Sequence, residues 1–286
     1  MSWVTEKLHN GYGQSFQASK VLFDSQTSYQ RLEIIETALW GRVMLLDGVV
    51  QTTEKDEFVY HEMFAHVPSF MHDSPNTVLI IGGGDGGLLR EVLKHEMIKK
   101  VVLVEIDSMV IDLCSKYLPG HSLQCWEDSR VEVVIADGKD YVRNCKHKFD
   151  LILSDSTDPI GPGEVLFEMD FYRQALQCLH EKGIIVTQNG VDFLQLAELK
   201  QTYSRMASLF QHNGFYSANV PTYVGGNMSF AWASNFYDCA QIDIDSIRKK
   251  FNVAKFATKY YTPEIHLAGF ALPRYVSDFL GANKDD

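Results

Sequence analysis

The chain has 286 residues, 45% of them hydrophobic, with 26 basic and 37 acidic side chains for a formal net charge of −11. This length suits one large domain or two smaller ones, and the negative charge disfavours nucleic acids and anionic membranes as partners while favouring a cationic small molecule. The five cysteines are an odd number without a C-x-x-C pair, which argues against a disulfide framework and against a zinc site.

The N-terminus and the cysteines together predict a location. MSWVTEKLHN lacks the apolar core of a signal peptide, and no run of about eighteen apolar residues follows it. Reduced thiols are typical of the cytosol. We therefore expect a soluble, cytoplasmic protein.

The beginning of the chain is predicted to form a small antiparallel β domain. YQRLEIIE (29–36) and GRVMLLDGVVQTT (41–53) have the composition of short strands. Within the second segment, Asp47-Gly48 is a strong two-residue hairpin signal, because both turn positions need positive φ.

A linking helix follows these strands. Thr53 and Asp56 indicate a capping box at its start, and we expect the helix to end before Pro68. The polar segment HDSPN is a link, so the domain boundary is predicted at residue 75. Residues 1–75 then form a β-hairpin domain with the linking helix, and residues 76–286 form a catalytic domain.

The second domain alternates apolar runs with helical stretches. The runs are VLII (78–81), VVLVEID (101–107), VEVVIAD (131–137), FDLILSD (149–155) and GIIVTQNG (183–190). Runs without period-two alternation are typical of strands buried on both faces of a parallel sheet. The pattern predicts a doubly wound, Rossmann-like α/β fold, to which SFAWAS (229–234) can add antiparallel edge strands; IDIDSIRKKF (242–251) predicts an exposed helix.

Carboxylates follow the predicted strands at their carboxyl ends, where ligands of such sheets bind. They are Asp85, Glu105, Asp107, Asp137, Asp155 and Asp158. A single aspartate after a strand is often a helix N-cap, which is the better interpretation of Asp107 and an equal alternative for Asp137. The set as a whole indicates a cation site, because converging carboxylates repel one another unless a cation relieves them.

The glycine-rich turn in VLIIGGGDGG follows the first of these strands. It can be read as G-x-G-x-x-G through Gly82, Gly84 and Gly87, and Glu105 lies about twenty residues further on, where a carboxylate can accept hydrogen bonds from both ribose hydroxyls of a nucleotide. A tight turn without any ligand is the alternative. Asp85 would repel a pyrophosphate at the helix N-terminus, so a nucleoside without phosphate fits better than a nicotinamide dinucleotide.

Methyltransferases that use S-adenosylmethionine (AdoMet) share this sheet, turn and acidic ribose ligand. Asp85 disfavours the carboxylate that AdoMet brings to this region. Decarboxylated AdoMet presents only an ammonium and a sulfonium, and both suit an acidic lining.

Several blocks of the chain together resemble the polyamine aminopropyltransferases, and most closely the bacterial spermidine synthases. The blocks are LDGVVQTTEKDEFVYHEM, VLIIGGGDGG, VEID, SDSTDPIGPGEVLF, QNG, VPTYVGG and YYTPEIHLAGFALP. The resemblance implies transfer of an aminopropyl group from decarboxylated AdoMet, as a co-substrate, to an amine that is usually putrescine. The products would be spermidine and 5′-methylthioadenosine, with no metal and no further cofactor. It also implies a homodimer or, as a dimer of dimers, a homotetramer.

The resemblance also assigns roles to residues of the donor site. Glu105 would hold the ribose and Asp137 with Gly138 the adenine amine, beside the turn of Gly82 and Gly84. Gln30 and Pro162 would complete the nucleoside pocket. Asp85 would bind the ammonium of the aminopropyl arm.

On the acceptor side, Asp155 matches the proton acceptor of the family, and Asp158 matches the group that anchors the other amine. The polar residues that match the lining of the amine channel are Gln51, Tyr60, His61 and Tyr223. Without the resemblance, His61 and both tyrosines would be interpreted as packed residues. His61 and His66 are five residues apart and diverge on a helix, so a shared metal is not expected.

The chemistry requires an acceptor amine with a free lone pair, although alkyl amines are protonated at neutral pH. Asp155 would be a poor base at its ordinary pKa unless burial raises that pKa or the proton passes on promptly. We therefore expect activity to rise with pH above neutrality. Cadaverine or a longer amine as acceptor, an AdoMet-dependent methyltransferase, and a non-catalytic nucleoside or polyamine sensor are the alternatives.

Overall fold

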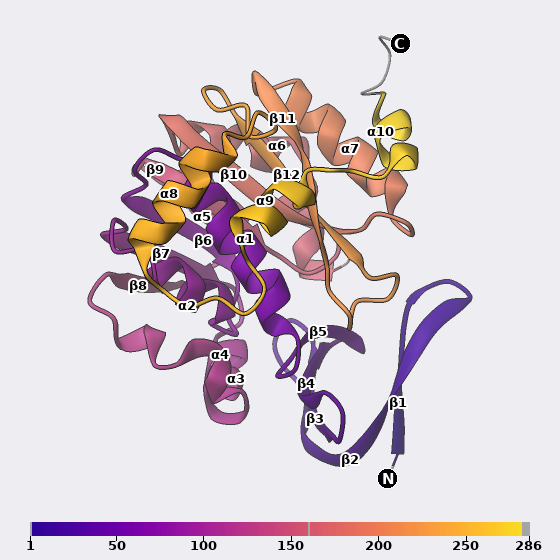
Figure 1. Ribbon diagram of the computed structural model, residues 1–286. Helices are drawn as coiled ribbons and strands as arrows, with labels where there is room; N and C mark the ends of the chain where they lie inside the picture. The colour runs from indigo at the N-terminus through magenta and orange to yellow at the C-terminus, as the bar shows by residue number, and fades with distance from the viewer. Residues whose placement is uncertain (1, 160, 282–286) are drawn as a thin grey trace.

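The computed structural model describes residues 2–159 and 161–281, which contain two β-sheets (Figure 1). The first is an antiparallel five-stranded sheet in the order β1-β2-β3-β4-β5. Its strands are β1 (Ser2–His9), β2 (Tyr12–Gln26), β3 (Arg31–Thr37), β4 (Gly41–Leu46) and β5 (Val49–Thr53). The predicted hairpin is confirmed, because Asp47 and Gly48 join β4 to β5 with φ angles of 49° and 78°.

The long hairpin of β1 and β2 was not identified from the sequence. Figure 1 shows it extending away from the rest of the molecule. Most β2 side chains are exposed or half-buried. The strand therefore lacks the clean alternation of apolar and polar residues by which a half-buried strand is identified.

The linking helix α1 (Glu57–Met71) differs from its prediction at both ends. Its N-cap is Asp56, whose carboxylate makes no capping bond and instead accepts hydrogen bonds from Thr53 Oγ1 (2.6 Å) and from Thr222 N and Oγ1 (2.9 and 2.7 Å). Pro68 lies inside the helix. Its cost of about 3 kcal/mol is offset because Phe70, beyond it, is buried in the core.

The second sheet has seven strands in the order β11-β12-β10-β9-β6-β7-β8. They are β6 (Thr77–Gly82), β7 (Lys100–Glu105), β8 (Val131–Ile135), β9 (Phe149–Asp155), β10 (Leu179–Val191), β11 (His212–Asn219) and β12 (Asn227–Ser234). β6 to β10 pair in parallel, which confirms the five predicted strands. β8 lies at the edge of the sheet and is partly exposed, so the prediction that this strand is buried on both faces was wrong.

SFAWAS forms β12, which is antiparallel as expected but is not at the edge of the sheet. It pairs with β10 on one side and with β11 on the other. The edge strand β11 has the sequence HNGFYSAN, and its glycine and asparagines weaken the strand signal. The prediction of an edge position for this segment was therefore wrong.

Helices cover both faces of the second sheet (Figure 1). They are α2 (Gly87–Leu93), α3 (Ser108–Tyr117), α4 (Pro119–Ser122), α5 (Gly138–Asn144), α6 (Met169–Gln177), α7 (Leu196–Ala207), α8 (Ile244–Ala254), α9 (Pro263–Gly269) and α10 (Arg274–Leu280), with 3-10 turns η1 (Cys125–Glu127) and η2 (Gly161–Phe167). Val78 and Ile80 of β6 pack with α1, α2 and α8 on one face, whereas Leu79 and Ile81 pack with α5, α6, α7 and α10 on the other. This alternation confirms the doubly wound architecture.

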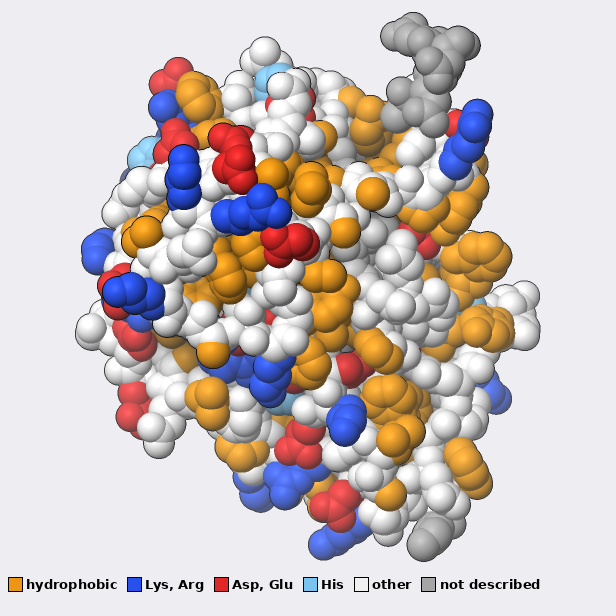
Figure 2. All heavy atoms as spheres, in the orientation of Figure 1, with side chains coloured by type: hydrophobic (Ala, Val, Ile, Leu, Met, Phe, Trp, Pro, Cys, Tyr) orange, Lys and Arg blue, Asp and Glu red, His pale blue; other side chains and the backbone are white. Residues whose placement is uncertain are grey.

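The surface over α8 is polar, as predicted for IDIDSIRKKF. Ile247 is the buried residue of this helix, and Arg248 forms ion pairs with Asp245 and Glu264 (both 3.0 Å). Figure 2 shows basic and acidic side chains interspersed over this face. In the described ranges, no helix combines the length and the apolar character needed to cross a membrane.

The two sheets meet at α3, which places the first sheet near the carboxyl ends of the second sheet's strands. Leu32, Met44 and Leu46 of the first sheet pack against Val110 and Leu113 of α3. Helix α1 packs into the core on one face of the seven-stranded sheet. The domain boundary at residue 75 stays a prediction. The chain goes from β6 to β7 on one side of β6 and later returns to β9 on the other side of β6. The strand order therefore switches between β6 and β9, and ligands are expected beyond the ends of these two strands.

Candidate active site

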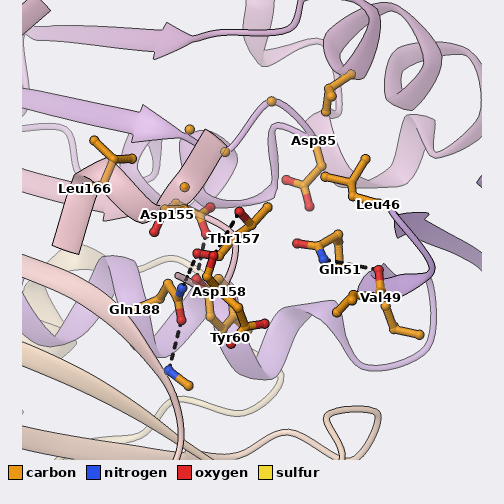
Figure 3. Close-up of a pocket in the computed structure, with 18 of the residues that line it drawn as sticks. Leu46, Val49, Gln51, Tyr60, Asp85, Asp155, Thr157, Asp158, Leu166 and Gln188 are labelled. Atoms are coloured by element: carbon orange, nitrogen blue, oxygen red, sulfur yellow. Dashed lines mark hydrogen bonds between the residues drawn. The ribbon is translucent and has the colours of Figure 1, made fainter. Parts of the chain in front are cut away.

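A large cavity lies at this switch point of the second sheet (Figure 3). It contains about 1280 Å³ of empty space including its opening, which is ample for a nucleoside with a short chain. The predicted site residues that line it are Gln30, Gln51, Tyr60, His61, Gly82, Gly84, Asp85, Glu105, Asp137, Gly138, Asp155, Asp158 and Tyr223. Pro162 belongs to η2, and its side chain falls outside what the structure describes.

The glycine turn brings three parts of the chain into close approach. Gly82 has a φ of +81°, and a Cβ there would lie 2.0 Å from the carbonyl oxygen of Asp155. A Cβ on Gly87 would lie 2.2 Å from Cε1 of the His61 ring. Only glycine therefore lets β9 and α1 pack against this turn.

Glu105, at the end of β7, is fixed by backbone donors. Its Oε1 accepts a hydrogen bond from Asp107 N (2.9 Å), and its Oε2 accepts one from Gly84 N (3.2 Å). Burial, together with the nearby charge of Asp107, raises the pKa of Glu105 to about 7, although the backbone donors act against this. Its carboxylate lies where β7 meets the glycine turn, as the ribose motif predicts.

Two of the carboxylates act as helix caps. Asp107 accepts a hydrogen bond from Met109 N (3.1 Å) at the start of α3, which confirms its interpretation as an N-cap. Asp137 accepts from Lys139 N (2.7 Å) and Asp140 N (3.2 Å) at the start of α5, and it also lines the cavity. The two alternatives weighed for Asp137 are therefore compatible.

Asp85 lies beside a histidine. Its Oδ1 accepts a hydrogen bond from Gly87 N (2.8 Å), and its Oδ2 lies 3.5 Å from His61 Nε2. Burial alone would raise the pKa of Asp85, but His61 outweighs burial and holds that pKa well below its ordinary value. Asp85 is thus an ionised carboxylate in the unliganded cavity.

Asp155, at the end of β9, has a different environment. Its Oδ1 accepts a hydrogen bond from the hydroxyl of Tyr60 (2.6 Å). Burial and then the charge of Asp85 raise the pKa of Asp155 to about 6, against the effects of His61 and Tyr60. The side chain can therefore gain and lose a proton near neutral pH, as a general acid or base needs.

The cavity extends past Asp155 toward β10. Asp158 Oδ1 accepts a hydrogen bond from Gln195 Nε2 (2.8 Å), and Gln188 Nε2 donates to the carbonyl of Thr157 (2.8 Å). Figure 3 shows Asp155, Asp158 and Gln188 on one side of the cavity and Asp85 with Gln51 on the other. Burial raises the pKa of Asp158.

Beside Ser156 and Thr157 of the SDSTDPIGPG block, four further polar residues line the cavity and were missed by sequence reasoning, namely Glu6, His9, Gln188 and Gln195. Glu6 is buried in β1 and accepts hydrogen bonds from Val50 N (2.9 Å) and Gln14 Nε2 (2.6 Å). Gln188 belongs to the QNG block, which was the only signal near any of the four. A lone glutamate and histidine in a polar strand carry no local pattern that marks a site.

The two histidines of HEMFAH have separate partners. His61 Nδ1 lies 2.6 Å from Glu57 Oε2 beside the cavity. His66 lies deeper, with Nε2 3.1 Å from Glu91 Oε2 and Nδ1 3.0 Å from His95 Nε2. The five-residue spacing therefore directs them to different sites, as its helical geometry predicts.

Family models match most of the chain. The model described as the spermine/spermidine synthase domain matches residues 57–245, and the one described as the spermidine synthase tetramerisation domain matches residues 2–54. Polyamine aminopropyltransferase 1 of Pseudomonas aeruginosa is 49% identical over 286 residues, covering 100% of both chains. The polyamine aminopropyltransferase of Pectobacterium carotovorum is 50% identical over 271 residues, covering 95% of this chain and 94% of that protein.

Solved structures with the same fold are also similar in sequence. A crystal structure of spermidine synthase in complex with the transition state analogue AdoDATO has a TM-score of 0.93 at 41% identity, covering 98% of this chain and 95% of that one. The spermidine synthase of Thermotoga maritima has a TM-score of 0.90 at 39% identity, with coverage of 98% and 94%. The chain therefore belongs to the spermine/spermidine synthase family and is a transferase of the polyamine aminopropyltransferase type.

Proposed function

We propose that this enzyme is a spermidine synthase, which transfers the aminopropyl group of decarboxylated AdoMet to putrescine and releases 5′-methylthioadenosine. The observation that carries the proposal is the pair of carboxylates Asp85 and Asp155, which line one cavity from the ends of adjacent strands. A donor with an ammonium suits Asp85, whereas the carboxylate of intact AdoMet would be repelled. The neighbouring structure solved with AdoDATO supports a donor of this kind.

The donor would occupy the part of the cavity between β6 and β8. Glu105 would accept hydrogen bonds from the ribose hydroxyls, and Asp137 with Gly138 would hold the adenine amine. Gln30 and Pro162 would close the nucleoside pocket. The glycine turn would let the sulfonium approach the backbone, with the aminopropyl ammonium on Asp85.

The acceptor would occupy the rest of the channel, and its distal amine would be cationic. Asp158 would anchor the distal ammonium of putrescine, and Asp155 would face the amine that reacts. The channel lining would include Gln51, Tyr60, His61 and Tyr223. The hydroxyl of Tyr223 donates a hydrogen bond to the carbonyl of Gln51 (2.7 Å), which supports a rigid wall on this side.

The reaction would be a direct displacement. The neutral amine attacks the methylene next to the sulfonium, the carbon–nitrogen bond forms, and the carbon–sulfur bond breaks with its electron pair going to a neutral thioether. Asp155 accepts the proton from the amine and passes it to water. A base with a pKa of about 6 releases that proton readily. Alignment of the amine with the methylene would supply much of the rate, on the order of 7 to 11 kcal/mol in model systems.

The deciding experiment is a mass-resolved assay of wild type and Asp155→Asn with decarboxylated AdoMet. The amines tested are putrescine, cadaverine and spermidine, and intact AdoMet is run in parallel. We expect methylthioadenosine and spermidine from putrescine, with kcat reduced by roughly 100-fold or more in the variant. If product forms only with another amine, that amine would replace putrescine as the proposed acceptor. Methyl transfer from intact AdoMet would refute the proposal.

We also propose the assembly and location of the enzyme. The match of residues 2–54 to a tetramerisation domain supports an oligomer, and we propose a homodimer that can pair into a homotetramer. Light scattering of the purified protein at two concentrations distinguishes the two states. The reduced cysteines and the polyamine chemistry favour the cytoplasm.

A further inference from the structure

A chain of alternating charges runs from the cavity into the contact between α1 and α2. It begins at Asp85 and continues through His61 and Glu57 of α1 to Arg90 and Glu91 of α2. The successive separations are 3.5 Å from Asp85 to His61, 2.6 Å to Glu57, 2.8 Å to Arg90 and 2.8 Å to Glu91. Only the first member and His61 line the cavity.

His61 faces a carboxylate at each ring nitrogen. Nδ1 lies 2.6 Å from Glu57 Oε2, and Nε2 lies 3.5 Å from Asp85 Oδ2. A neutral imidazole has one N–H and can present a donor to only one of these carboxylates, whereas an imidazolium presents an N–H to both. The geometry therefore favours the charged form of His61.

Glu57 is itself held in place. The oxygen that faces His61 also accepts a hydrogen bond from Arg90 Nη2 (2.8 Å). Arg90 is anchored by Nη1, which donates to the carbonyls of Gly120 (3.0 Å) and His121 (2.8 Å). The guanidinium keeps Glu57 ionised and aimed at the ring, and it cannot lose its own proton.

The remaining neighbours of His61 do not replace this arrangement. The charged and titratable groups around the ring are Glu57 and Tyr60 on α1, Asp85 in the glycine turn, Arg90 on α2, His121 on α4 and Asp155 on β9. Burial lowers the pKa of His121, so this ring stays neutral near pH 7. Burial also opposes the charge on His61, but Asp85 and Glu57 raise its pKa to about 10.

We propose that Glu57, fixed by Arg90, is a positioning residue that keeps His61 as a cation between Glu57 and Asp85. His61 then acts as an internal counter-ion for Asp85 and Asp155 while the cavity holds no substrate. The assignment of Asp85 to a substrate ammonium rests on the proposed function, whereas the charge of His61 does not.

Two consequences follow for the reaction. The positive charge near Asp155 keeps its pKa lower than it would be beside Asp85 alone, so more of it is available as a base at neutral pH. The same charge moderates the attraction between Asp85 and an incoming ammonium. Both effects depend on the positive charge of His61.

The direct test is an NMR titration of the full-length protein with 15N-labelled histidine, with the His61 signals assigned by their loss in His61→Gln. We expect both His61 nitrogens of wild type to stay in the imidazolium state from pH 6 to at least pH 8.5. In Glu57→Gln the midpoint falls by about one pH unit or more. A neutral His61 in wild type at pH 7.5 would overturn the proposal, and this measurement needs no turnover.

The matched control is Glu96→Gln, which removes one acidic charge from an exposed position just beyond α2. It should leave the His61 titration unchanged, and an equal shift in both variants would refute the specific role of Glu57. In the transferase assay, Glu57→Gln should leave the acid limb of kcat/KM close to its wild-type pH, because His61 with a midpoint about one unit lower is still charged where Asp155 titrates, and Glu96→Gln should behave like wild type. Absence of turnover in wild type would refute the proposed function and leave the NMR result standing.

Discussion

Two aspartates line one cavity, Asp85 from the glycine turn after β6 and Asp155 from the end of β9, and their pKa values are shifted in opposite directions. Asp85 has its pKa held well below the ordinary value, whereas the pKa of Asp155 is raised to about 6. Burial by itself would raise the pKa of both aspartates. The difference lies in their partners, because Asp85 has the His61 cation and the backbone N–H of Gly87, while Asp155 has a neutral phenol and the like charge of Asp85.

Neighbouring carboxylates with separated pKa values can divide an acid–base reaction between them. An ionised Asp85 is suited to holding a cation throughout the cycle. Asp155 can exchange a proton near neutral pH. The fold produces both from one residue type by placing Asp85 beside a histidine of α1 and Asp155 beside a tyrosine of the same helix.

After Asp155→Asn, the largest expected effect comes from Asp85→Asn. Removing this charge should raise KM for decarboxylated AdoMet by roughly 10- to 100-fold, because an ammonium loses a charge-assisted hydrogen bond. It should also shift the acid limb of kcat/KM to lower pH, since Asp85 raises the pKa of Asp155. Steady-state kinetics with a varied donor test both. An unchanged KM would show that Asp85 does not bind the donor's ammonium.

A smaller effect is expected for Tyr60→Phe. In wild type, kcat/KM should rise as pH increases through about 6, where Asp155 loses its proton, and continue to rise above neutrality as the acceptor amine deprotonates. The Tyr60 hydroxyl stabilises the ionised Asp155, so its removal should shift the lower limb upward by about half a unit to one unit and reduce kcat/KM by up to about twofold at pH 7.

The control for that experiment is Tyr12→Phe, which removes a hydroxyl at an exposed position of β2. Its pH profile should match wild type. A wild-type profile that is flat from pH 6 to 9 would contradict both the role of Asp155 as base and the need for a deprotonated amine.

The smallest effect is on the stability of the unliganded protein. A raised pKa in the folded state means that the ionised Asp155 costs stability, in full above about pH 6 and not at all below about pH 4. At pH 8, Asp155→Asn should therefore raise Tm by about 2 °C or more. The lowered pKa of Asp85 means that its charge is stabilising above about pH 4, so Asp85→Asn should lower Tm at pH 8.

Differential scanning fluorimetry at pH 8 and pH 4 measures both variants against wild type. Shifts in the same direction for the two variants at pH 8 would mean that partners do not separate the two aspartates. The Asp155→Asn shift should shrink toward zero at pH 4, because the carboxyl is then protonated in both the folded and the unfolded state.

Features with a local cause were predictable from the chain alone. The Asp47-Gly48 turn depends only on backbone sterics, and the buried runs from Val78 onward have a composition that suits a parallel sheet. The carboxylates at the strand ends follow from that sheet, because parallel strands end at one edge. Cap positions such as Asp107 also follow from local preference.

Features that depend on distant neighbours were not predictable. Glu6 and Gln195 reach the cavity from positions far apart in the chain, and neither is part of a pattern. Helix α1 continues past Pro68 because the core accommodates Phe70, which outweighs a strong local stop signal. The order of β11 and β12 depends on pairing, which strand composition does not encode.

By itself, the sequence determined the sheet, its acidic edge and the resemblance to a family, because periodicity, turn chemistry and motif spacing are properties of neighbouring residues. The tertiary structure alone decided the charge states. Asp85 and Asp155 are the same amino acid after similar strands, and the distances from His61, Glu57 and Tyr60 decide which one keeps its charge and which one exchanges a proton. Electrostatic energies depend on separation and burial in space, and neither is contained in the order of residues along the chain.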